Sequence, residues 1–181
     1  MERTQATSLA LADRTSAQVG ALWDRVGDGL TVPQFQRLAA QVIVQANAQG
    51  VALIDLGLTA EVLRQLGRIT PPLGLRPTAD QIDTERISGR IGELLDQDVK
   101  TTDLAASQRL RLEYLAHSEP LLTVAVTMQA AMAAHGAKGW TRALDDKPCP
   151  ACVSLADGVV RPTGTTMRRH PNCGCMQAPV F

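Results

Sequence analysis

Aromatic side chains are scarce in this chain, which has 181 residues but only two tryptophans, two phenylalanines and one tyrosine. Large rings therefore cannot fill its interior, and we expect a core of Leu, Val, Ile and Ala. An excess of either charge is also missing, because 18 basic residues balance 18 acidic ones. This balance gives no overall attraction to nucleic acid, so charge does not indicate contact with DNA.

A long uninterrupted apolar run is missing as well. The most apolar segment, residues 120–134, is too short for a membrane span and is interrupted by Thr123, Thr127 and Gln129. We expect it to form a buried central helix or a helix that faces another subunit, without membrane contact. The polar start, Met1–Gln5, lacks the apolar segment of a secretory leader, so we expect no signal peptide.

Cysteine is absent from the first 148 residues, and all four cysteines lie in the 27 residues from Cys149 to Cys175. The pattern is Cys149-x2-Cys152, then 17 residues, then His170-x2-Cys173-x-Cys175. A Cys-x2-Cys pair can place both thiolates on one side of a turn, as Zn²⁺ requires. The later group offers three candidates for the two remaining tetrahedral positions. One of the five residues would then be spare or would orient a ligand.

Two other states of these cysteines stay open at this point, namely two disulfides and four free thiols. Disulfides are typical of secreted domains, which the polar start disfavours. A zinc ion here would be structural, because protein side chains would fill every coordination position and leave none for a substrate.

The predicted fold class is mainly α, with a helical body at 1–136. Hydrophobic spacing predicts helices over 8–26 and from Pro33 to Ala46, and Thr31 is the expected N-cap of the second. The apolar run 50–58 fits either a strand or a helix. We favour helix there, because alanine and leucine outnumber β-branched residues.

Capping residues predict further helix boundaries. Thr59 is expected to cap a short helix that Gly67 closes, and a loop is expected over 70–78. Thr78 or Asp80 would open the next helix.

That helix would continue to Val99, and Asp103 would cap another. The segment Ser118–Pro120 supplies an N-cap and a proline suited to a first turn, so it predicts a new helix start.

The composition changes after Gly136, where glycine, proline, aspartate and cysteine become frequent. We call residues 137–181 the C-terminal module. Asp157-Gly158 predicts the turn of a short β-hairpin, which would bring the first cysteine pair back toward the second. A segment this small buries little apolar surface, so a metal or cross-link is expected to hold its shape.

A second pattern runs through the C-terminal module. Its residues are Trp140, Asp146, Cys149, Cys152, Leu155, Gly158, the run His170–Cys175 and the ending Pro179–Val180. In order and spacing they resemble the Mu F-like minor head proteins of tailed bacteriophages, over residues 139–181. The helical stretch before them is similar to that of actinobacterial-phage members. Gly174 departs from the family, which often has arginine there, and this puts any role of that arginine in doubt.

The resemblance implies a minor capsid protein near the portal that acts in head morphogenesis and is not an enzyme. It implies the portal protein or the major capsid protein as partner, and multiple copies within a larger assembly. The location would be the virion, in the capsid interior or at the portal vertex, after synthesis in the host cytoplasm.

A rival interpretation is an enzyme. His117-Ser118-Glu119 and Pro148-Cys149-Pro150-Ala151-Cys152 match the H-x-E and P-C-x-x-C elements of zinc deaminases. In that interpretation His117, Cys149 and Cys152 would hold zinc, and Glu119 would move protons.

The context of this match argues against the enzyme. A deaminase sheet needs strands before the H-x-E helix, whereas residues 1–116 predict helix. The match also leaves His170, Cys173 and Cys175 without a role. The third interpretation is a generic interaction module held together by zinc. Only the family resemblance separates it from the minor head protein.

Overall fold

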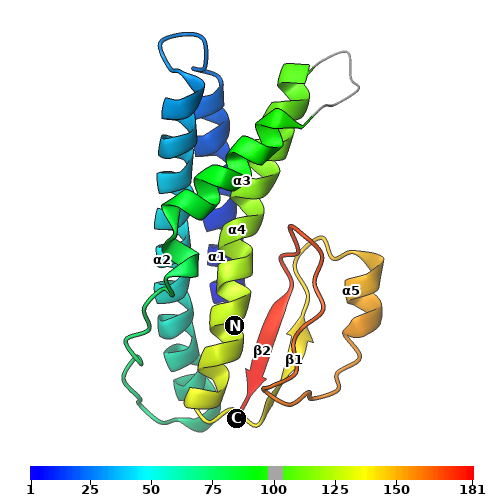
Figure 1. The fold of residues 1–181 in the computed structure, drawn as a ribbon. Coiled ribbons are helices and arrows are strands. Elements are labelled where there is room, and N and C mark those ends of the chain that lie inside the picture. Colours follow the sequence, from blue (N-terminus) through cyan, green and yellow to red (C-terminus); the bar gives the residue numbers. More distant parts are fainter. Residues whose placement is uncertain (98–103) are drawn as a thin grey trace.

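Three long helices form the body of the computed structural model, which describes residues 1–97 and 104–181. Helices α1 (Glu2–Trp23), α2 (Val32–Leu66) and α4 (Leu104–Ala134) lie side by side, and α3 (Thr84–Asp96) crosses α2 and α4 obliquely (Figure 1). The predicted mainly α fold class is confirmed.

Helix α2 is a single helix of 35 residues where the sequence predicts separate pieces. It begins as predicted, because Thr31 and Gln34 form a capping box, and it ends at Gly67 with φ 62°. Thr59 does not cap a helix: it lies inside α2, and its hydroxyl donates to Asp55 O at 2.9 Å. The helix favoured over 50–58 is confirmed, and it continues through Gly50, where the missing side chain lets Val124 of α4 approach closely.

Helix α4 likewise continues for 31 residues through Pro120, so the predicted helix start at Ser118–Pro120 is wrong. The Ser118 hydroxyl donates to Leu115 O at 3.2 Å, within the same helix. Helix α4 lies between α1, α2 and the C-terminal module, and this packing offsets the hydrogen bond that proline removes.

Other predicted boundaries shift by a few residues. Helix α3 begins after Asp83, whose carboxylate accepts the Arg86 N–H at 3.0 Å, and a single 3₁₀ turn, Asp80–Ile82, precedes it. Helix α1 begins at Glu2 rather than residue 8 and ends at Trp23. The predictions for Val99 and Asp103 lie outside the described residues.

The C-terminal module contains a two-stranded sheet and one short helix. Strand β1 (Gly139–Ala143) pairs antiparallel with β2 (Met176–Val180), and α5 (Pro150–Leu155) lies between them in sequence. The predicted hairpin around Asp157-Gly158 is therefore wrong: the antiparallel strands are Gly139–Ala143 and Met176–Val180, which are far apart in sequence. Figure 1 shows the sheet and α5 beside the lower half of α4.

Two large apolar clusters make up most of the core in the described part of the chain. The first contains Phe35, Ile43, Ile87, Ile91 and Leu112, from α2, α3 and α4. The second joins the helices to the C-terminal module, and its members include Ile54, Leu58, Met128, Met132, Trp140, Met167 and Met176. The predicted boundary at 136/137 falls just after α4, and apolar packing continues across it.

Replacing Trp140 with Ala should lower the free energy of unfolding by about 3–5 kcal/mol. The side chain is 2% exposed, and its Nε1–H donates to Thr165 O at 3.1 Å. Because Trp140 shares a cluster with Ile54 and Met128, we expect the helical transition in far-UV circular dichroism to move to lower temperature as well. A helical transition at unchanged temperature, with the C-terminal module alone unfolded, would contradict the shared core.

Glu61 lies where the end of α2 meets β2. Gln65 donates to Pro179 O at 2.8 Å and accepts from Phe181 N at 3.2 Å. The Glu61 carboxylate is 4% exposed and accepts from Arg64, Gln65 and the amino group of Met1. The hydrogen bond from Arg64 lowers the pKa of Glu61 to about 2, although burial acts in the opposite direction.

Because this pKa lies below the unfolded value of 4.5, ionised Glu61 stabilises the fold above about pH 4.5, and the effect is lost as the pH falls toward 2. Glu61→Gln should therefore cost about 1–3 kcal/mol at pH 7 and progressively less in acid. Urea unfolding at pH 7, 5 and 3 measures this difference. A difference that does not change with pH would show that the charge of Glu61 does not stabilise the fold.

Candidate metal centre

Two loops meet beside β1 and β2, and each carries part of the predicted cysteine and histidine set. Cys149 is the N-cap of α5, and its Sγ accepts the Cys152 N–H at 3.3 Å. Pro150 occupies the first helical turn, where its missing N–H costs nothing. The other donors, His170 to Cys175, come from the loop that leads into β2.

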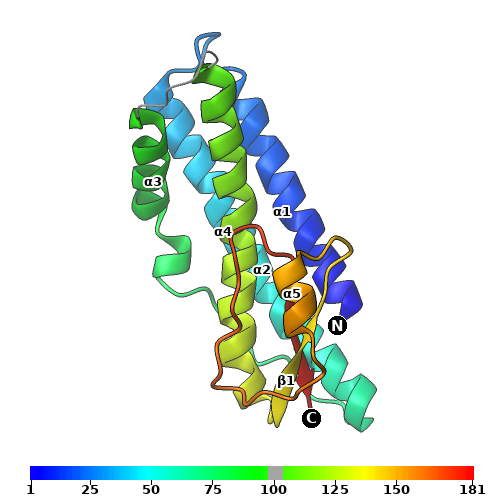
Figure 2. The same cartoon turned by 90° about the vertical axis from the view of Figure 1, so that its right-hand side faces the viewer.

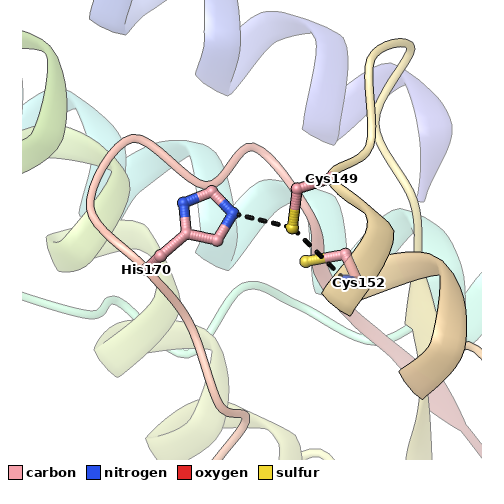
Figure 3. A group of neighbouring side chains, drawn as sticks. All are labelled: Cys149, Cys152 and His170. Carbon is pink, nitrogen blue, oxygen red and sulfur yellow. Dashed lines mark hydrogen bonds between the residues drawn. The ribbon is translucent and has the colours of Figure 1, made fainter.

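The other four predicted donors surround Cys152. Its Sγ lies 3.5 Å from Cys173 Sγ, and His170 Nε2 lies 3.1 Å from Cys149 Sγ. The donor atoms form two groups, each with all members within 4.8 Å of one another: Cys149, Cys152 and His170, then Cys152, Cys173 and Cys175. Figure 3 shows the first group, with the His170 ring turned toward Cys149.

These distances suit a metal ion bound by sulfur and nitrogen. Zinc bond lengths imply about 3.5–3.8 Å between tetrahedral donors, and the two distances above lie within about half an ångström of that range. Three of the four cysteines are between 1% and 3% exposed. His170 Nδ1 lies 2.8 Å from Pro171 O, so a proton on Nδ1 is donated there and leaves the Nε2 lone pair for a metal. The cluster is thus close enough to bind a metal ion.

The four thiols differ in how readily they ionise. The Cys152 N–H lowers the pKa of Cys149. Burial opposes ionisation of Cys173, yet the Cys175 N–H and the Cys152 side chain outweigh it and lower the pKa of Cys173. Burial raises the pKa of Cys152 and of Cys175. A bound divalent cation would supply the charge that the Cys152 and Cys175 thiols need to lose their protons.

Two arginines support this cluster, and the sequence analysis missed both. Arg142, in β1, donates to Cys152 Sγ at 3.4 Å and to Arg168 O at 2.7 Å. Arg169 is partly buried and donates to Leu121 O of α4 at 2.9 Å and to Cys173 O at 2.5 Å. Their positive charges offset those of the thiolates. In the sequence, the position of Arg169 directly before His170 is the one feature that could have indicated its role; nothing indicates Arg142.

Gly174 sits where the chain passes close to α1. A Cβ at this position would lie 2.6 Å from Leu9 Cδ2 and 2.7 Å from Asp145 Oδ2. The Gly174 carbonyl also accepts from Gln5 Nε2 at 3.0 Å. Glycine therefore allows the last cysteine loop to pack on α1, and an arginine there would require these neighbours to move.

The structure does not assemble the deaminase set. His117 Nδ1 lies 3.1 Å from Asn172 Oδ1, and Nε2 lies 3.2 Å from Asp13 Oδ1. Glu119 is 4% exposed and forms ion pairs with Arg86 and Arg90. Within residues 1–97 and 104–181, neither His117 nor Glu119 belongs to a group of metal-type donors.

Comparisons of the chain with protein-family models, with curated protein sequences and with solved structures give no match.

Protein purified without oxygen should contain about one metal ion per chain, with its cysteine thiols protected from alkylation. Cys152→Ser should abolish metal binding, because Cys152 belongs to both donor groups. Ser154→Ala, on the exposed side of α5, is the matched control and should keep the metal. Elemental mass spectrometry and a thiol count measure both quantities. Four reactive thiols without metal would contradict the site, and so would two disulfides.

Proposed function

We propose that this chain is a structural protein held by a zinc ion, and that it acts through assembly rather than catalysis. The observation that carries this proposal is the donor set around Cys152. The donors lie in two groups of three that share Cys152, and a zinc ion that draws on both groups would have four protein ligands and no open position for water or substrate. Sites of this closed type are structural.

The metal would join the two loops of the C-terminal module. Cys149 and Cys152 lie at the beginning of α5, whereas the later donors lie directly before β2. These loops contain little regular structure, and their own apolar contacts are the small cluster around Cys152, Cys173 and Cys175. A shared metal ion would therefore supply much of the cohesion that a larger core would otherwise give.

The finer proposal is a minor head protein of a tailed bacteriophage. It is supported by the likeness of residues 139–181 to the Mu F-like proteins. It is also supported by the contacts that several residues of this resemblance make in the structure. Trp140 is part of the shared core, Cys149 begins α5, and Pro179 accepts a hydrogen bond from Gln65 of α2. The portal protein or the major capsid protein would be its partner, in the virion, after synthesis in the host cytoplasm.

Analysis of purified phage heads tests this proposal. We expect an antibody against the chain to detect a few copies in each DNA-filled head purified from cells that make the particles. Heads produced with Cys152→Ser should lack the chain or fail to mature, whereas His117→Ala should be incorporated as the wild type is. A chain found only in the soluble fraction, beside normal heads, would overturn the head-protein proposal and leave the zinc-stapled interaction module. Loss of a deaminase activity in His117→Ala would support the enzyme instead.

A further inference from the structure

The last turns of α2 carry an apolar surface on their outward side. Leu56, Leu63 and Leu66 are 60%, 48% and 47% exposed. The two acidic residues of this stretch, Asp55 and Glu61, are only 5% and 4% exposed. Figure 2 shows these turns projecting at the lower right, past the other helices. Exposed apolar side chains that gather on one side of a helix are a feature of interaction sites.

The segment after α2 extends this surface. Ile69 is 87% exposed and Leu73 is 43% exposed. The Asp55 carboxylate accepts the backbone N–H groups of Leu73, Gly74 and Leu75 at 2.7 to 3.0 Å. These three hydrogen bonds hold the segment against α2, so the position of Leu73 beside the helix is fixed.

The outward residues of this stretch have the spacing of a coiled coil. We call them the outer seam: Ala52, Leu56, Thr59, Leu63 and Leu66, which alternate steps of four and three residues.

The opposite side of the same turns faces the core. Ile54, Leu58 and Val62 lie there and are fully buried. Helix α2 thus has two apolar faces, and within the described residues only the inward one is covered by the chain's own packing.

We propose that the outer seam pairs with the outer seam of a second copy of this chain, with the two α2 helices antiparallel and a two-fold axis near Thr59. Leu56 of one copy then faces Leu63 of the other, and Ala52 faces Leu66, so a small side chain lies opposite a large one. The same surface serves both copies, as a two-fold dimer requires. This proposal depends neither on the metal nor on a role in a phage head.

The sizes of the side chains favour the antiparallel arrangement over a parallel one. A parallel pair would set Ala52 against Ala52, leaving a gap, and would bring the two Arg64 side chains to the same height along the pair. The Arg64 side chain is 66% exposed, and the antiparallel pair keeps the two guanidinium groups about 15 Å apart along the helix axis. The net charge of zero leaves no overall repulsion between copies.

The size of the outer seam limits the affinity of the dimer. The outer seam with Ile69 and Leu73 contributes seven side chains, whereas a stable interface has about 20–30 residues on each side. The dimer is therefore weak, and its population rises with protein concentration.

Sedimentation equilibrium in reducing buffer tests this proposal. Leu56→Glu and Leu63→Arg should each weaken the dimer at least about tenfold, because each places a charge in the apolar seam. The double variant should recover much of the affinity, since the new carboxylate of one copy then faces the new guanidinium of the other. Leu110→Glu is the control: it changes an exposed leucine of α4, 67% exposed, and should have no effect. Circular dichroism verifies that each variant is folded.

Three results would overturn the proposal. The first is a wild-type chain that stays monomeric at every concentration. The second is a double variant that stays as weak as the single variants, because the two helices are then not antiparallel. The third is a monomer that binds vesicles of neutral and anionic phospholipid and loses that binding in Leu56→Glu. A lipid surface would then cover the seam, as the length and apolar composition of α2 would allow.

Discussion

Packing of the β1–β2 sheet against the long helices is the constraint on which the candidate site depends. Trp140 at the start of β1 and Met176 at the start of β2 are buried with Met128 of α4. Because the two strands pair over their full lengths, the loops that precede β2 and follow β1 are brought to the same place. The donors around Cys152 therefore meet at a point that the apolar core has already determined.

The donors could be predicted from sequence, whereas their surroundings could not. Cysteine is rare in this chain and confined to one region, so spacing alone selected five residues that the structure brings together. Arg142 and Arg169 act through backbone carbonyls and one sulfur atom. Arginine is common and no local pattern marks such contacts, so they become visible only when β1, α4 and the last loop are placed together.

The helical fold class could be predicted, but the lengths of the helices could not. Gly50, Thr59 and Pro120 are each typical of a helix end, and each lies inside a continuous helix. Local preference is a weak signal, and burial of one face along α2 and α4 outweighs it. The sheet was misplaced for a related reason: Asp157-Gly158 is a sound turn, but strands pair where their side chains can be buried, and that occurs beside α4.

The metal centre and the outer seam are linked through the end of α2. On its inward side, Gln65 exchanges hydrogen bonds with Pro179 and Phe181 at the end of β2. On its outward side, Leu63 and Leu66 belong to the seam. A metal ion that held the loop before β2 would also steady the strand on which the last turn of α2 rests. A structural metal would thus serve surfaces well beyond its own ligands.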